Sequence, residues 1–532
     1  MARKRFAPRP EPVRDLRGTD ADRTFLQPAA MRAWVASLPV AHPQRTAESL
    51  LEALATINDH RMPARRLRRL LAALEPATER TARLVAASGA DGGSATLPAN
   101  GASTTALKLR EELVRGYRLL QRIAGPGGRR FRHASGRILH HTGAVLEQCH
   151  GSHAEPPPGL WHLLHSQARS APRGQRNRRY QAVLLAAACN PWGLRREQIP
   201  VLYAYSRRWA GALRIAARAS GYGDIAFMPR ADAGPFPVAA GQTSPEGTLF
   251  LNPGRVLKYV ERERRRMARR GAAADNTASL VLERLASQLP RARPRRYPRR
   301  RARGRVTVVS GLSSIHRTLT GGSEAADPRA VFDGHALNGG EARGEDVWNL
   351  ILPSAELTQN LGDTGPQARR PPLPEPPHES DWALRDRSPD GYRLAHPGEE
   401  VDGVRVGRLL LLAEAGRGQN PSLWELGVVR WLRHHRTGDV EVGVSIIAPR
   451  VTGLTLTAET PGGARTPAFG GLLTAAVPRL GIQENLVMPS LHIDEGRPVW
   501  QQTDSGELPL QLISCAEREI DFTRYQIQRV GF

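Results

Sequence analysis

The first half of the chain is dominated by hydrophobic residues at helical spacing. Leu50, Leu51, Leu54 and Ile57 fall on one helical face, and the run from Leu67 to Leu74 repeats the pattern. The polar segment N-D-H-R-M-P between them is typical of a turn, so the two runs predict a helical hairpin. Further helices are predicted at about 105–123, 133–149, 158–171, 178–189, 196–219 and 255–289.

Alternation of apolar and polar residues replaces this pattern in the second half, after a first short β segment near 225–253. The strand-like segments are V-T-V-V, W-A-L, Y-R-L, V-R-V-G-R-L-L-L-L, W-E-L-G-V-V-R-W-L-R and V-E-V-G-V-S-I-I-A. Short β pieces continue from 451 to 532, and they are T-G-L-T-L-T, G-G-L-L-T-A-A-V, E-N-L-V-M-P-S, P-L-Q-L-I-S and Y-Q-I-Q-R-V. Closing a small antiparallel sheet on itself removes its exposed edges, so these segments predict a barrel.

The pattern predicts a multidomain α+β protein, with an all-α helical N-terminal region followed by an antiparallel β-barrel and a second β-rich module. The predicted parts are a flexible basic tail (1–23), a mostly helical domain (24–290), a barrel (291–450) and a C-terminal β-rich module (451–532). A Gly/Pro/Ala-rich stretch near 320–380 predicts a long disordered insertion in the barrel. One apolar piece within it, Val347 to Pro353, is a candidate extra strand.

The net charge of +25 over 532 residues favours polyanionic partners such as nucleic acid, acidic membrane surfaces or phosphate ligands. Nearly all the positive charge is arginine, because lysine occurs only at Lys4, Lys108 and Lys258. This composition is also typical of a G+C-rich genome, so we discount part of the charge. Aromatic residues make up only 5%, which leaves few stacking platforms for nucleic acid, and we find no DNA- or RNA-binding motif.

Three scattered cysteines, Cys149, Cys189 and Cys515, form neither a disulfide framework nor a Cys-x-x-Cys metal motif, which favours a reducing cytoplasm. The basic start of the chain lacks the apolar segment of a secretion signal, and no run of about 18 apolar residues occurs. We therefore expect a cytoplasmic protein without a membrane span. We also find neither a phosphate-binding glycine loop with its lysine nor a nucleophile elbow, so we predict no enzymatic activity.

Histidines cluster between His133 and His165, but their spacing argues against a metal site. His140 and His141 are adjacent, so on a helix their side chains diverge by about 100° and are not expected to face one ion. His162 and His165 share a face, yet no glutamate completes a zinc-protease pattern. We predict solvated or packing histidines and no metal.

The candidate binding chemistry lies in the segment D-R-S-P-D-G, from Asp386 to Gly391. Asp386 and Ser388 are two apart on a predicted strand and so leave the same face. The S-P-D-G sequence predicts a turn, with Gly391 accepting a positive φ. A carboxylate and a hydroxyl on one face suit the polar edge of a small flat molecule.

An arginine-rich run from Arg291 to Arg305 precedes the first barrel strand. Guanidinium groups are planar forks that pair with phosphate or with the O6/N7 edge of guanine. Arg-x-x-x-Arg before a first strand, followed by Asp-x-Ser-x-x-Gly at a hairpin, resembles the PilZ family of bacterial cyclic-di-GMP receptors. The residues to which this resemblance gives ligand roles are Arg295 and Arg299 as clamps on the nucleotide, or Arg296 and Arg300 one step along, with Asp386, Ser388 and Gly391. Arg299 and Asp386 are 87 positions apart, farther than is usual in the family.

The resemblance implies a cyclic-di-GMP-binding signalling receptor with a PilZ-like barrel. Two segments of the helical half, G-L-W-H-L-L-H and C-N-P-W-G-L-R-R-E-Q-I, are similar to the N-terminal part of large PilZ proteins linked to type IV pili and surface motility. A protein of pilus or motility machinery is therefore an implied partner, and biofilm control an implied process. The alternatives are a PilZ-like scaffold that binds no nucleotide and a basic nucleic-acid-binding protein.

Overall fold

The three-dimensional arrangement of the chain is given by a computed structural model. The described residues are 26–39, 41–88, 101–169, 175–219, 225–238, 244–270, 277–289, 297–321, 379–398, 401, 403–414, 424–459, 465–476, 483–491, 493, 495–519 and 521–529. The predicted tail (1–23), most of the predicted insertion and the candidate strand Val347 to Pro353 lie outside these residues.

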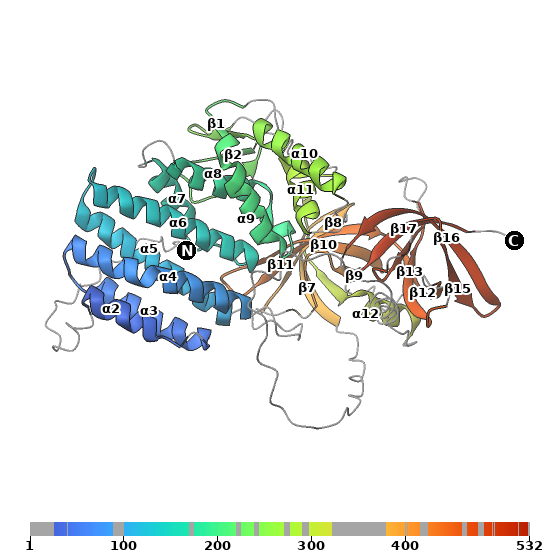
Figure 1. Cartoon of the computed structure of the whole chain (residues 1–532). Helices are drawn as coiled ribbons and strands as arrows, with labels where there is room; N and C mark the ends of the chain where they lie inside the picture. The colour runs from blue at the N-terminus through green and yellow to red at the C-terminus, as the bar shows by residue number, and fades with distance from the viewer. Residues whose placement is uncertain are drawn as a thin grey trace, which may run out of the picture. The chain divides into compact units, whose positions relative to one another are not determined.

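Helices form most of the described part of the first 290 residues (Figure 1). They are α2 (Pro28–Ser37), α3 (Pro43–Asp59), α4 (Ala64–Ser88), α5 (Gly101–Ala124), α6 (Arg129–Gly151), α7 (Leu160–Arg169), α8 (Gln175–Ala188), α9 (Gln198–Trp209), α10 (Gly254–Arg269) and α11 (Thr277–Gln288). A small sheet of order β1-β4-β2-β3 belongs to the same region, with β1 (Arg214–Ala216), β2 (Ile225–Phe227), β3 (Phe236–Pro237) and β4 (Leu249–Asn252).

Strands form most of the described part of the second half. They are β5 (Arg300–Arg301), β6 (Arg305–Ser310), β7 (Glu379–Ser388), β8 (Gly391–His396), β9 (Leu409–Glu414), β10 (Glu425–His434), β11 (Val440–Ala448), β12 (Val451–Ala458), β13 (Phe469–Thr474), β14 (Asn485–Met488), β15 (Pro498–Thr503), β16 (Gly506–Arg518) and β17 (Thr523–Arg529). The first seven form a sheet of order β5-β7-β6-β9-β10-β11-β8, and because β7 also pairs with β8 the sheet closes. The last six form a closed barrel of order β12-β13-β14-β17-β16-β15. The predicted fold class, a helical region followed by a barrel and a further β module, is therefore confirmed.

The chain divides into two compact units. One contains Met1–Arg303, Ala383–Val406 and Val429–Val444, and the other contains Gly304–Trp382, Gly407–Val428 and Ser445–Phe532. In the first unit, α2 to α6 lie side by side around one leucine-rich core, and α7 to α11 enclose a second core with the small sheet (Figure 1).

The second unit is built around the C-terminal barrel. Its interior is filled by side chains of its own strands, such as Leu456, Phe469 and Tyr525. The short helix α12 (Leu312–Thr320) packs on β12 and β13, where His316 Nε2 is 3.0 Å from the Leu454 carbonyl oxygen. Burying one apolar face of a helix on a barrel is the ordinary way in which such a segment gains stability.

The structure differs from the predicted elements in several places, including the following three. Helix α9 ends at Trp209, ten residues before the predicted end, because the chain turns at Ala210–Ala212 and then pairs as β1 with β4. The predicted helix over 255–289 is two helices, α10 and α11. Strand β15 was not predicted, since its sequence P-V-W-Q-Q-T has only a short apolar stretch, and its pairing with β12 and β16 supplies the missing stability.

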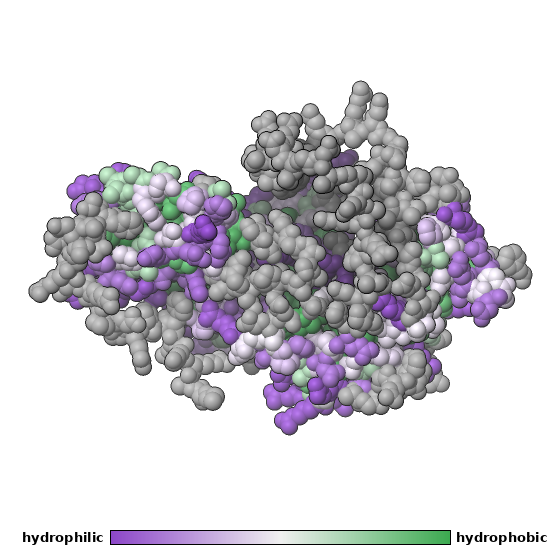
Figure 2. Space-filling model, turned by 90° about the horizontal axis from the view of Figure 1, so that it is seen from below, coloured by the Kyte–Doolittle hydropathy of each residue, from purple (hydrophilic) through white to green (hydrophobic). Residues whose placement is uncertain are grey.

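The surface mixes polar and apolar side chains. On the face drawn in Figure 2, purple hydrophilic residues are interspersed with smaller green hydrophobic areas. Scattered exposed apolar residues of this kind are normal for globular proteins. Within the described residues, none of the helices combines the length and the apolar composition that crossing a bilayer requires.

Close packing of α3, α4 and α5 at Gly116 makes a first prediction. A Cβ at this position would lie 2.6 Å from Leu71 Cδ2 and 2.7 Å from Asn58 Oδ1, and both neighbours are buried. Alanine normally stabilises a helix interior relative to glycine. Here we expect Gly116→Ala to lower the free energy of unfolding by about 1–3 kcal/mol, because the buried neighbours must move.

Thermal unfolding followed by circular dichroism measures this effect. The matched control is Gly151→Ala at the end of α6, where no atom lies within 4 Å of the added Cβ; we expect a change below about 0.5 kcal/mol. A stabilised Gly116→Ala variant would contradict the packing described for these helices.

Candidate functional site

The candidate site is built on the hairpin of β7 and β8. Backbone pairing runs from Ser388↔Gly391 and Arg387↔Tyr392 to Asp386↔Arg393, so only Pro389 and Asp390 form the loop. A register shift between Leu384 and Asp386 places one extra residue in β7. Such a bulge re-aims the side chains that follow it. Asp386 is therefore positioned by a tight turn on one side and by a bulge on the other.

The hairpin differs in detail from its prediction. Ser388 is buried, and its hydroxyl donates to Asp390 Oδ1 at 2.6 Å and lies 3.2 Å from the Gly391 carbonyl oxygen. The hydroxyl therefore bonds within the turn and stabilises it. Gly391 is not among the described residues with positive φ, so the predicted left-handed glycine is wrong. Proline in the loop explains this, because its ring holds φ near −65° and favours an ordinary turn.

Strand β5 brings the arginine-rich segment to this hairpin. Arg300 pairs with Arg387 and Arg301 with Asp386, both antiparallel to β7. Continuing that register places position 299 beside Ser388 and diagonal to Asp386, on the same face. Arg299 Nη1 lies 2.7 Å from Asp386 Oδ1, with 22% and 15% of the two side chains exposed. A charge-assisted hydrogen bond thus joins two residues that are 87 positions apart.

The register distinguishes the two possible arginine pairs. Arg300 is exposed and, by the alternation of a strand, leaves the opposite face from Arg299. Of these two described arginines, Arg299 is the one that contacts Asp386. Arg295 and Arg296 lie outside the described residues.

Sequence reasoning missed Arg393, which lies opposite Asp386 on β8. Its Nη1 is 3.7 Å from Asp386 Oδ2, and its Nη2 is 2.7 Å from Glu441 Oε1. The two-residue loop was a usable signal, since it fixes Asp386 and Arg393 as a cross-strand pair of opposite charge. Glu441 is 48 positions further along the chain, and no local pattern predicts it.

The network continues from Glu441 to the helical region within the same unit. His435 Nε2 is 3.4 Å from Glu441 Oε2, and its Nδ1 is 3.4 Å from Glu155 Oε2. Backbone bonds reinforce this contact: the Glu155 amide donates to the His434 carbonyl at 2.8 Å, and the His434 amide to the His153 carbonyl at 2.7 Å. The hairpin is thereby connected to the end of α6 through alternating acids and bases.

This arrangement can bind an anionic group together with the hydrogen-bond donors on the edge of a planar ring. Arg299 and Arg393 offer two guanidinium forks on either side of one carboxylate, and all three side chains are partly exposed. A phosphate would pair with a fork, while the carboxylate accepts N–H groups of a purine.

Comparisons with known proteins show what the chain is similar to. Residues 29–219 match the family model "Cyclic-di-GMP receptor FimW, N-terminal domain", and residues 227–452 match "Cyclic-di-GMP receptor FimW, middle PilZ domain". The chain is 28% identical over 229 residues to the cyclic-di-GMP receptor FimW of Pseudomonas aeruginosa. That alignment covers 37% of this chain and 37% of the relative. No solved structure matches the chain.

The fold and the hairpin site define a PilZ-domain protein with a helical N-terminal region. Since the two models together extend over most of its length, the chain belongs to the family of large PilZ-containing receptors that they describe. The resemblance seen in the two sequence motifs is thereby confirmed.

The ion pair at the hairpin makes a prediction for the protein without nucleotide. Asp386→Asn removes the charge that holds Arg299, and a partly buried pair of this kind contributes about 1 kcal/mol. We expect the non-proline amides of residues 297–303 to exchange with deuterium roughly fivefold faster, because local opening costs less. Hydrogen exchange measured by mass spectrometry gives this rate.

The matched control is Asp381→Asn on the same strand. Asp381 pairs with Arg305 at 3.2 Å, but 51% and 70% of these side chains are exposed, so the pair contributes little. Unchanged exchange of 297–303 in Asp386→Asn would mean that backbone pairing alone holds the arginine segment.

Proposed function

We propose that the protein is a cyclic-di-GMP receptor whose binding site includes Arg299 and Asp386. The observation that carries this proposal is their contact at 2.7 Å, which unites the two halves of the PilZ motif across 87 positions. The description of FimW as a cyclic-di-GMP receptor supports the same ligand. We further propose that the receptor is cytoplasmic and catalyses no reaction.

Binding would exchange the partners of Arg299. Each phosphodiester group of the ligand carries one negative charge, which a guanidinium fork meets with two parallel hydrogen bonds. Once Arg299 turns to the phosphate, Asp386 would accept hydrogen bonds from the N–H groups on a guanine edge. Arg393 remains a second positive charge near Asp386 and limits the cost of moving Arg299 away. Arg295 would clamp the second side of the nucleotide, and Arg296 and Arg300 remain the alternative register for that role.

Ser388 and Gly391 would act by shaping the turn. The Ser388 hydroxyl already bonds within the loop, so its role would be to hold the hairpin that presents Asp386. Replacing Ser388 would therefore act mainly by loosening the turn, and less by removing a direct contact with the ligand.

A change at Asp386 would reach the helical region through Arg393, Glu441 and His435. These residues form consecutive ion pairs that end at Glu155, so a shift of Arg393 alters the contacts of each in turn. We propose that this network couples nucleotide binding to rearrangement of the helical region and so to docking of a protein partner. A component of pilus or motility machinery is the proposed partner, as the similarity of the helical half implies.

Replacing Arg299 tests the proposal. We expect Arg299→Ala to weaken binding of cyclic-di-GMP at least tenfold, since a charge-assisted bidentate contact is worth about 1.5–3 kcal/mol. Isothermal titration calorimetry measures the affinity. The matched control is Arg303→Ala, an exposed arginine of the same run that makes the same change in net charge.

Titrations with GTP and duplex DNA at two salt concentrations separate the alternatives. A receptor binds the cyclic dinucleotide with modest salt dependence and loses affinity only in Arg299→Ala. A basic nucleic-acid-binding protein binds DNA with affinity that falls steeply with salt, because counterions are released, and both arginine variants weaken it alike. No binding of any nucleotide by the unaltered chain would leave the scaffold alternative.

A further inference from the structure

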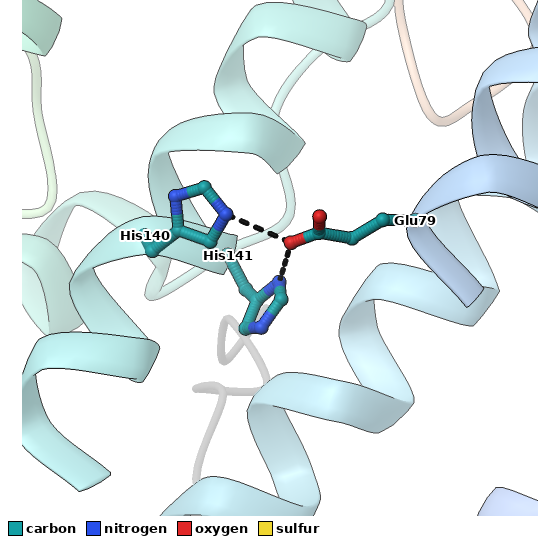
Figure 3. A group of neighbouring side chains, drawn as sticks. All are labelled: Glu79, His140 and His141. Atoms are coloured by element: carbon teal, nitrogen blue, oxygen red, sulfur yellow. Dashed lines mark hydrogen bonds and ion pairs between the residues drawn. The ribbon is translucent and has the colours of Figure 1, made fainter. Parts of the chain in front are cut away.

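A second cluster of ligating side chains lies in the helical bundle, away from the hairpin. Glu79 on α4 faces His140 and His141 on α6, as Figure 3 shows. Glu79 Oε1 is 2.8 Å from His140 Nε2 and 3.9 Å from His141 Nδ1. One oxygen and two ring nitrogens, all within 4.8 Å of one another, converge on a single point.

This convergence corrects the sequence argument that adjacent histidines do not face one ion. The Cβ directions of His140 and His141 do diverge, but the ring nitrogens extend several ångströms beyond the helix backbone. Glu79 approaches from the neighbouring helix between the two rings (Figure 3), so both reach the same carboxylate. The direction of the Cα–Cβ bond alone therefore did not determine where the ring nitrogens lie.

His141 is held by a second carboxylate on its other side. Its Nε2 lies 2.7 Å from Glu75 Oε1, and Glu75 Oε2 accepts from Tyr117 at 2.9 Å and from Arg137 at 3.1 Å. The Tyr117 ring also stacks on the imidazole, with centroids 5.6 Å apart. Because a carboxylate only accepts hydrogen bonds, the proton of neutral His141 resides on Nε2.

The opposite nitrogen of His141 is left with a free lone pair. His141 is 0% exposed, and its Nδ1 has no hydrogen-bond partner among the described residues. This nitrogen faces Glu79 and His140. Burying a hydrogen-bond acceptor without a donor costs free energy, and a cation bound to this nitrogen would remove that cost.

We propose that Glu79, His140 and His141 bind a divalent transition-metal ion, with zinc as the ion that suits the ligands best. Two imidazole nitrogens and one carboxylate oxygen are a ligand set that zinc accepts at about 2.0–2.2 Å, with water in a fourth position. Donors around such a tetrahedral ion lie roughly 3.4 Å apart, a value between the two distances from Glu79 Oε1. Small rotations of the side chains would bring both contacts of Glu79 to this spacing.

The surroundings have the features of a metal site beyond its direct ligands. Metal-bound histidines usually donate their other N–H to a carboxylate, which fixes the ring and raises its basicity. His141 already directs its Nε2–H to the Glu75 carboxylate before any ion is present. His140 and Glu79 are partly exposed, at 37% and 30%, which leaves an entry path and room for a water ligand. In the metal-free protein the His140 proton occupies the place that the ion would take.

Zinc titration of the chelator-treated full chain tests the proposal. We expect one tight site per chain and a rise in the thermal unfolding midpoint with zinc, since the ion binds only the folded bundle. His140→Ala and Glu79→Gln should each weaken this site at least about 100-fold. Glu75→Gln removes no ligand but alters the carboxylate behind His141, and should weaken it about 10–100-fold.

The matched control is His162→Ala, an exposed histidine on α7 that should leave the affinity within about twofold. Cobalt loading gives a second readout, because visible absorption bands from nitrogen and oxygen ligands appear without thiolate bands. The midpoint of each variant without metal separates misfolding from lost ligands. Absence of a tight site, or equal affinity in His140→Ala, Glu79→Gln and His162→Ala, would overturn the proposal.

Discussion

The contact between the Arg299 guanidinium and the Asp386 carboxylate is the interaction on which the candidate site depends. Bridging 87 positions is not costly in itself, because loop-closure entropy grows only by about 0.6 kcal/mol for each doubling of length. A partly exposed ion pair is nevertheless too weak to organise the chain. Backbone pairing of Arg300 and Arg301 with β7 brings the segment to the hairpin, and the ion pair then orients Arg299 within it.

The same weakness suits a site that must exchange partners. A fully buried pair would resist separation, because each charge left behind would lie in a medium of low dielectric. Arg299 and Asp386 keep 22% and 15% of their surface exposed, and Arg393 supplies a second positive charge 3.7 Å from Asp386. Turning Arg299 towards an anion therefore leaves the carboxylate solvated and still paired. Arg299 therefore has an ordered position in the absence of ligand, and moving it away from Asp386 costs little free energy.

The sequence predicted those features that depend on neighbours along the chain. Helical spacing of leucines predicted α3 and α4, and proline beside aspartate predicted the hairpin turn. Features that depend on partners across the fold were missed. Choosing Arg299 over Arg300 requires the register of β5 on β7, and Glu441 meets Arg393 only after the sheet has closed.

His141 shows why an argument from one helix is incomplete. Glu75 and Glu79 are four residues apart on α4 and so present two carboxylates on one face. This pair brackets the imidazole, with one oxygen 2.7 Å from Nε2 and another 3.9 Å from Nδ1. Arg393 is bracketed in the same way by Asp386 and Glu441. In both networks the closer acid holds the base in place, and the more distant acid also faces the site where a ligand is proposed to bind. The bundle and the hairpin thus orient a base between two carboxylates by the same physical means.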